Sequence, residues 1–317
     1  MTDDRLAVGV IGVGSMGQHH ARVYQELPTA TLVGLSDVDE QQAAEAAAKY
    51  GAEAMDVDSL LRKADAVSIV VPTPFHYETA MTAIEAGVDL LVEKPLVEAP
   101  ADGRELVRAA ADAGVTLQVG HVERFNPAVR TLSEITTDLE TIAVDSQRLG
   151  PPTNREITDG VALDLMIHDA DILLSLVDSP VATVSASGTA GNQYVAATVE
   201  FENSVVATLT ASRVTQEKVR TLSITAEECR VNVDYMAQSV QINRHSLPEY
   251  IETNGDVRYR HENVIERPTV ENGEPLKKEL SSFVSAVTNG TEPLVTGEDG
   301  IRALELVQRI DELAVET

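Results

Sequence analysis

Short apolar runs alternate with helical stretches in the N-terminal part of the chain. Five runs rich in β-branched residues are long enough for buried strands, at residues 6–11, 31–35, 66–71, 88–92 and 116–119. Continuous apolar runs of this kind are typical of strands buried on both faces of a parallel sheet. Helical segments between them end at glycines, such as 40–50 before Gly51 and 77–86 before Gly87. The alternation predicts a doubly wound α/β sheet.

The pattern changes in the C-terminal part. Two helical segments, 127–137 and 161–177, flank a strand near 141–148. Further strands then follow one another at 181–190, 194–201, 205–212, 219–225, 230–235 and 239–243. Consecutive strands joined by short turns predict a large, mainly antiparallel sheet. Two last helices, 276–288 and 298–313, close the chain.

The two patterns define two predicted domains, as a chain of 317 residues favours. Residues 1–122 form a Rossmann domain, and residues 123–317 form an α+β domain for substrate binding and oligomerisation. The final helices can pack back on the Rossmann domain. Helices cover only one face of the antiparallel sheet, so we expect an apolar open face that needs a partner. This predicts a homodimer or a homotetramer.

Charge and composition restrict the partners and the compartment. There are 51 acidic and 24 basic residues, six of them lysine, which gives a formal charge of −27. Such a surface repels a phosphate backbone, so we exclude nucleic acid. Scattered acidic residues with few lysines indicate adaptation to high intracellular salt, which screens the repulsion between them.

The sequence also bears on the location of the protein. No run approaches the ~18 apolar residues of a membrane span, and no signal peptide is recognised. The lone Cys229 cannot form an internal disulfide. We expect a cytoplasmic protein without membrane contact.

A glycine-rich motif follows the first predicted strand. It reads Gly12-Val13-Gly14-Ser15-Met16-Gly17 and opens a helix. Gly12 allows a tight turn, Gly14 lets backbone N–H groups approach a pyrophosphate, and Gly17 lets the helix pack on the strand. Asp37 ends the second strand 20 residues later, where a carboxylate bonds the adenosine ribose hydroxyls and repels a 2′-phosphate. The motif predicts NAD as cofactor, with NADP less favoured.

Two further segments follow predicted parallel strands, where ligands of such sheets bind. Pro72-Thr73-Pro74-Phe75-His76 comes after the third of these strands, and Glu93-Lys94-Pro95 after the fourth. We expect cofactor contacts from Pro72, Thr73, Pro74, His76, Glu93 and Lys94. Lys94 is expected near the nicotinamide, although a solvated surface lysine has the same signature.

The C-terminal part brings its own acid–base pair. Asp164 and His168 are four residues apart in an otherwise apolar helix, so their side chains share one face. A neutral imidazole is suited to accepting a hydroxyl proton while hydride leaves the same carbon. A surface pair or a structural histidine would give the same spacing, so the spacing alone leaves the role open.

Taken together, these motifs resemble the Gfo/Idh/MocA (glucose–fructose oxidoreductase and inositol dehydrogenase) family. The likeness includes the segment from Gly120-His121 to Phe125-Asn126-Pro127 and spans nearly the whole chain. It implies hydride transfer between nicotinamide and a secondary alcohol of a sugar, cyclitol or nucleotide sugar. It implies that His168 takes the hydroxyl proton, Lys94 stabilises the charge on that oxygen and Asp164 orients both. Segment 120–127 most resembles members acting on UDP-activated amino sugars at the 3-position, with Arg124 as a substrate ligand for a phosphate or carboxylate.

Two other classes remain open at this point. A dinucleotide-sensing regulator could use the same fold without turnover, and an NAD-recycling lyase or glycosidase could use the same residues. The remaining histidines are interpreted as mostly structural because none of them pairs with a carboxylate at metal-ligand spacing, and we predict no catalytic metal. They are His19, His20, His76, His121, His245 and His261.

Overall fold

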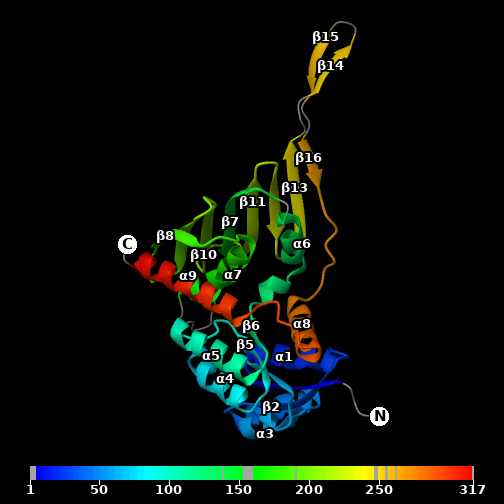
Figure 1. Ribbon diagram of the computed structural model, residues 1–317, viewed down its shortest axis with the longest axis vertical. Helices are drawn as coiled ribbons and strands as arrows, with labels where there is room; N and C mark the ends of the chain where they lie inside the picture. Colours follow the sequence, from blue (N-terminus) through cyan, green and yellow to red (C-terminus); the bar gives the residue numbers. More distant parts are fainter. Residues whose placement is uncertain are drawn as a thin grey trace. The chain divides into compact units, whose positions relative to one another are not determined.

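The computed structural model describes residues 5–137, 139–152, 160–189, 191–245, 249–253, 256–260 and 263–315. The chain forms two compact units, Met1–Phe125 with Gly273–Glu305, and Asn126–Asn272 with Leu306–Thr317 (Figure 1). His261 and the side chain of His245 lie outside the described residues. Each unit is described below by itself.

The first unit is built on a six-stranded parallel sheet with the order β3-β2-β1-β4-β5-β6. The predicted doubly wound sheet is therefore confirmed. This order reverses direction between β1 and β4, and the crevice beyond the carboxyl ends of these strands is where such sheets bind ligands. The strands are β1 (Leu6–Ile11), β2 (Ala30–Ser36), β3 (Glu53–Ala54), β4 (Ala66–Ile69), β5 (Asp89–Glu93) and β6 (Leu117–Gly120).

Helices follow each strand of this unit, and α8 lies against α1 and η2. Tyr24 of α1, Leu35 of β2 and Phe283 of α8 are fully buried in one hydrophobic cluster. The helices are α1 (Ser15–Glu26), α2 (Glu40–Tyr50), α3 (Val57–Leu61), α4 (His76–Glu85), α5 (Pro100–Ala113) and α8 (Pro275–Asn289), with short 3₁₀ turns η1 (Thr73–Phe75) and η2 (Val122–Phe125). Helix α9 (Gly297–Val315) begins in the first unit and ends in the second.

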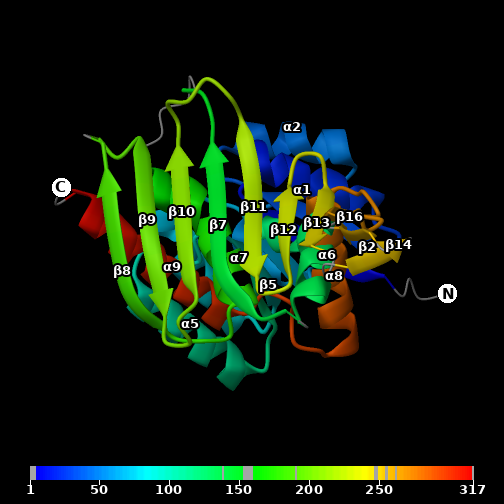
Figure 2. The same ribbon diagram turned by 90° about the horizontal axis from the view of Figure 1, so that it is seen from above.

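The second unit contains an eight-stranded sheet with the order β16-β13-β12-β11-β7-β10-β9-β8 (Figure 2). Its pairs are antiparallel except β7 with β10, which run parallel. The predicted mainly antiparallel sheet is thus confirmed. The strands are β7 (Thr141–Leu149), β8 (Val181–Gly188), β9 (Tyr194–Phe201), β10 (Val206–Ser212), β11 (Val219–Ala226), β12 (Cys229–Asp234), β13 (Ser239–His245) and β16 (Asn263–Glu266), and β14 (Glu249–Thr253) pairs only with β15 (Asp256–Arg260).

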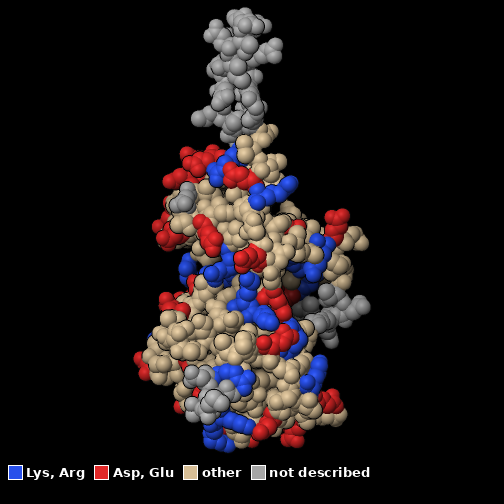
Figure 3. Space-filling model, turned by 90° about the vertical axis from the view of Figure 1, so that its right-hand side faces the viewer, with Lys and Arg blue, Asp and Glu red and all other residues tan. Residues whose placement is uncertain are grey.

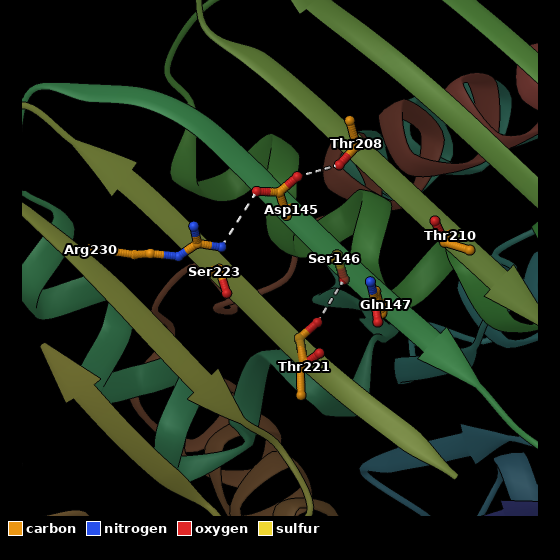
Figure 4. Close-up of a pocket in the computed structure, with 8 residues that line it drawn as sticks. All are labelled: Asp145, Ser146, Gln147, Thr208, Thr210, Thr221, Ser223 and Arg230. Atoms are coloured by element: carbon orange, nitrogen blue, oxygen red, sulfur yellow. Dashed lines mark hydrogen bonds and ion pairs between the residues drawn. The ribbon is translucent and has the colours of Figure 1, made fainter. Parts of the chain in front are cut away.

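Helices α6 (Pro127–Thr136) and α7 (Ile167–Leu176) lie against this sheet, and Val144, Leu209 and Leu222 are among the strand residues buried beneath them. The side chains on the open face are mostly polar, so the expected apolar open face is wrong. This face contains a hollow of about 350 Å³ (Figure 4). Its lining residues are Asp145, Ser146, Gln147, Thr208, Thr210, Thr221, Ser223 and Arg230.

Acidic and basic side chains lie next to one another across the face shown in Figure 3. Among the described residues, no helix has both the length and the apolar character needed to cross a membrane.

Candidate active site

The glycine turn between β1 and α1 shows a separate reason for each glycine. Gly12 has φ +90°, and a Cβ there would lie 2.6 Å from the carbonyl oxygen of Val70. A Cβ on Gly17 would collide with the carbonyl oxygen of Gly12. At Gly14 a Cβ would meet nothing within 4 Å, and Gly14 provides no side-chain cap for α1. The first turn of α1 therefore offers its backbone N–H groups to an anion.

Asp37 is tied to this turn. Its Oδ2 accepts the N–H of Val13 at 2.7 Å, and its Oδ1 accepts the N–H of Asp39 at 3.0 Å. The side-chain amide of Gln42 lies 3.3 Å from Oδ2. These contacts hold the carboxylate beside the glycine motif, and Oδ1, with one printed donor, has room for a further one.

A cavity of about 710 Å³ opens at this end of the first unit. This volume lies within the range of small-molecule sites. Val38 and Phe75 are both exposed and supply apolar walls of the kind that suit a flat heterocycle. The lining residues are Ile11, Gly12, Gly14, Ser36, Asp37, Val38, Gln42, Asp56, Val57, Val70, Val71, Pro72, Phe75 and Thr79.

The cavity includes some of the predicted cofactor residues and not others. Gly12, Gly14, Asp37 and Pro72 line it. Thr73 and Pro74 form the 3₁₀ turn that follows Pro72, but they do not line the cavity. The other predicted residues outside the lining are Ser15, Met16, Gly17, His76, Glu93 and Lys94. Ser15 is exposed at the start of α1, whereas Met16 is half-buried and packs on the core.

His76 connects two loops of the first unit. Its side chain is buried, with Nδ1 2.9 Å from the carbonyl oxygen of Pro95 and Nε2 2.8 Å from that of Val71. The ring therefore fixes the segment after β4 against the segment after β5. A cofactor contact from His76 stays a prediction, and what the structure adds is this positioning role.

Glu93 is held beside Lys94 at the end of β5. Its Oε1 accepts a hydrogen bond from Nε2 of His20 at 3.0 Å, and its Oε2 accepts the N–H of Lys94 at 3.2 Å. Burial alone would raise the pKa of the Glu93 carboxyl, but the hydrogen bond and charge of His20, with the charge of Lys94, bring that pKa below its usual value. Lys94 thus follows a buried anion.

His121 lies at the carboxyl end of β6 and is fully buried. Burial, with smaller effects from the positive charges of Lys94 and Arg124, lowers the pKa of His121 to about 3. The imidazole is neutral at physiological pH. Arg124 itself is half-buried in η2, and its N–H donates to the carbonyl of His121 at 3.0 Å.

In the second unit, Asp164 stands in a π-helical turn, Ala162–Met166, that leads directly into α7. In an α-helix, residues four apart are offset by about 40° around the axis. The π turn that contains Asp164 departs from this α-helical geometry before His168 is reached. Both side chains are half-buried. Such turns often occur at functional sites.

Two arginines near this helix were not singled out in the sequence. Arg213, just after β10, donates to Oδ2 of Asp164 at 2.7 Å. Arg148 of β7 donates to both oxygens of Asp169 at 2.6 and 3.1 Å, and this pair is almost fully buried. The one available signal was Asp169 itself, an acid beside His168 in an apolar helix, which requires a buried partner.

Among the described residues, no group of three or more His, Cys, Asp or Glu side chains is arranged to hold a metal ion. Cys229 is buried, and burial raises the pKa of its thiol. A thiol in such surroundings is a weak nucleophile.

Two family profiles match the chain. One is described as an oxidoreductase family with an NAD-binding Rossmann fold, over residues 6–121, and the other as the C-terminal alpha/beta domain of that oxidoreductase family, over residues 148–314. A UDP-N-acetylglucosamine 3-dehydrogenase from Acidithiobacillus ferrooxidans is 34% identical over 242 residues, which are 75% of this chain and 76% of the relative. A solved structure of a UDP-N-acetylglucosamine 3-dehydrogenase from the same organism matches with a TM-score of 0.90 at 30% identity, over 98% of this chain and 97% of that chain.

Other relatives are named as inositol dehydrogenases. An inositol 2-dehydrogenase from Rubrobacter xylanophilus is 30% identical over 202 residues, which are 58% of this chain and 56% of the relative. A structure of scyllo-inositol dehydrogenase from Lactobacillus casei with NAD(H) and scyllo-inositol has a TM-score of 0.81 at 20% identity, a likeness that shows the fold alone.

Proposed function

Because the chain belongs to the Gfo/Idh/MocA family of oxidoreductases, we propose that it is an NAD-dependent dehydrogenase of a secondary alcohol on a nucleotide-linked amino sugar. The observation that carries the proposal is the match to UDP-N-acetylglucosamine 3-dehydrogenase, which extends over nearly the whole chain at a TM-score of 0.90. In sequence, the inositol 2-dehydrogenase matches 58% of the chain, against 75% for the UDP-sugar dehydrogenase, so cyclitols are the second class to test.

The first unit fits the adenosine half of a dinucleotide. Gly14 leaves open space at the start of α1, where we expect the pyrophosphate, and Asp37 lies beside the glycine turn, where we expect the ribose hydroxyls. Val38 and Phe75 suit the adenine ring. When bound, the nicotinamide supplies the chemistry of accepting a hydride from the alcohol carbon. The Asp37 carboxylate, joined by Asp56 in the lining of the same cavity, supports NAD over NADP.

Three side chains are assigned to the reaction on the family motif. His168 accepts the hydroxyl proton, Lys94 donates a hydrogen bond to that oxygen as its negative charge develops, and Asp164 orients the hydroxyl and the lysine. Arg124 is assigned to a phosphate of the substrate, since a guanidinium matches phosphate geometry. Glu93 supports the assignment of Lys94, because its Oε2 accepts the backbone N–H of Lys94 and so helps to fix that residue at the end of β5.

The test is NADH formation from UDP-N-acetylglucosamine, with free N-acetylglucosamine, myo-inositol and scyllo-inositol as comparators. We expect turnover with the UDP-sugar to exceed the others by at least about tenfold in kcat/KM, because only that substrate offers phosphates to Arg124. If only an inositol were turned over, the proposed substrate class would be cyclitols and not nucleotide-linked sugars. Cofactor binding without any turnover would favour the sensing regulator, and product formation without net NADH would favour the NAD-recycling lyase or glycosidase.

Self-association into a homodimer or homotetramer remains part of the proposal, although the open face of the sheet is polar. Light scattering gives the molecular mass directly, and a particle of 34.0 kDa would contradict self-association.

We also propose a cytoplasmic location, because a single cysteine fits a reducing compartment. The charge of −27 supports a salt requirement, because unscreened acidic groups repel one another. Unchanged activity and melting temperature in dilute buffer would overturn the salt requirement.

A further inference from the structure

We propose that Arg213 is a positioning residue for Asp164 and thereby sets the efficiency of the reaction. The inference rests on the proposed function, in which Asp164 orients the substrate hydroxyl. Arg213 Nη2 donates to Asp164 Oδ2 at 2.7 Å, within the second unit. The side chain of Arg213 is 13% exposed and that of Asp164 is 30% exposed. The guanidinium of Arg213 is therefore mostly buried, while part of the Asp164 carboxylate stays accessible to a ligand.

One turn anchors both partners of this ion pair. The N–H of Arg213 donates to the carbonyl of Gln193 at 2.9 Å, and the N–H of Val161 donates to the carbonyl of the neighbouring Asn192 at 3.3 Å. Val161 begins the helical segment that carries Asp164. The backbone on each side of the pair is thus attached to adjacent residues, which fixes where the two side chains can meet.

Asn192 is itself held in place. Its side-chain amide donates to Oδ1 of Asp311 at 3.0 Å, and Asn192 adopts φ +49° after Gly191 at φ +81°. The turn is therefore tied to the C-terminal part of α9. The same anchor serves the arginine and the start of the π turn.

A π turn makes such an anchor necessary. Its i→i+5 hydrogen bonds take the place of the α-helical pattern at Asp164, so the geometry of a regular α-helix does not position this side chain. A misplacement of about 1 Å in a catalytic group can cost about 100-fold in rate. A charge-assisted hydrogen bond from Arg213 supplies both attraction and direction to the Asp164 carboxylate.

The experiment compares Arg213→Gln, Arg213→Lys and Asp164→Asn, singly and as the double variant Arg213→Gln/Asp164→Asn. We expect Arg213→Gln to lower kcat/KM by about 10- to 100-fold, the loss of one hydrogen bond to a charged group, with NADH affinity unchanged. Arg213→Lys should recover part of the loss. In the Asp164→Asn background, Arg213→Gln should cost no more than about twofold, because the two residues act as a unit.

The matched control is Arg244→Gln. Arg244 of β13 pairs with Glu266 of the edge strand β16 at 3.0 Å in the same unit. This variant should leave kcat/KM near the wild-type value. If it falls as far as Arg213→Gln, a general loss of stability explains both results and the inference is wrong.

Chemical rescue separates positioning from folding. Millimolar guanidinium added to Arg213→Ala should restore several-fold of the lost activity, whereas equal urea or ammonium should not, since only guanidinium has the planar donor fork. Additive losses in the double variant, or no selective rescue, would overturn the inference while leaving the dehydrogenase assignment intact. A wild-type protein without turnover would overturn the assignment first, and the inference with it.

Discussion

Nε2 of His20 lies 3.0 Å from Oε1 of Glu93, a contact between residues 73 positions apart in the sequence. His20 is fully buried in α1, and the Glu93 side chain is 12% exposed. The histidine therefore compensates a carboxylate that would otherwise be costly to bury. This contact fixes the end of β5 from which Lys94 follows.

Replacing His20 by leucine should lower the free energy of unfolding by about 1.5–3 kcal/mol, the value of a hydrogen bond to a charged group. The measurement is urea unfolding followed by circular dichroism. His19→Leu is the matched control, because His19 is the preceding residue and is exposed. Equal stability of the two variants would show that the His20–Glu93 contact contributes nothing.

The buried His121 predicts a specific dependence of stability on pH. Its folded-state pKa is about 3, while an unfolded histidine titrates near pH 6.5. Between these values the unfolded state binds more protons, so stability falls as pH decreases from about 6.5, by up to about 1.4 kcal/mol per pH unit. His121→Asn should flatten this dependence between about pH 5 and pH 6.5, above the range of most carboxyl groups. An unchanged slope in urea unfolding would contradict the assignment.

An added methyl group should affect stability at Gly17 and cofactor binding at Gly14. Gly17→Ala places a Cβ against the carbonyl oxygen of Gly12, so we expect at least about 1–3 kcal/mol of destabilisation. Gly14→Ala meets no protein atom within 4 Å and should fold normally. It should weaken NADH binding, because its methyl occupies the side that a pyrophosphate approaches. Fluorescence titration of NADH on folded Gly14→Ala decides the point, and wild-type affinity there would sink the assignment.

Asp37 should set the cofactor preference. The wild-type protein should bind NADH more tightly than NADPH, and Asp37→Asn should narrow the ratio of the two dissociation constants by about tenfold, since it removes one repulsive charge. Asparagine keeps an oxygen that can accept the N–H of Val13, so the glycine turn is retained. Asp58→Asn, an equal change of charge at an exposed residue outside the cavity, is the control. Tighter NADPH binding by the wild type would contradict the prediction.

The sequence was sufficient for the parallel sheet because its strands are continuous apolar runs. It could not reveal β3, since this strand has only two residues, Glu53 and Ala54, and both are exposed. The polar open face was readable from alternation, because Thr208 and Thr210 alternate with the buried Ala207, Leu209 and Ala211 along β10. The prediction of an apolar face failed because it followed from sheet architecture and not from these side chains.

The candidate site was only partly readable for a different reason. The glycine motif and Asp37 are local signals, and the structure brings them together at one cavity. By contrast, Glu93 is bonded to His20, which is 73 positions away in the sequence. Asp164 is bonded to Arg213, which is 49 positions away. No local pattern encodes such pairs, and they depend on the tertiary fold. The π turn at Asp164 is also absent from the apolar periodicity, which predicted a continuous helix.

The central claim is that His168 is the proton acceptor of a dehydrogenase. The most direct measurement is the steady-state kinetics of His168→Asn with UDP-N-acetylglucosamine and NAD, beside a titration of NADH binding. Asparagine keeps a polar side chain but removes the general base, so kcat should fall by about 10²–10⁴-fold while NADH affinity stays unchanged. Turnover of His168→Asn at the wild-type rate would contradict the account.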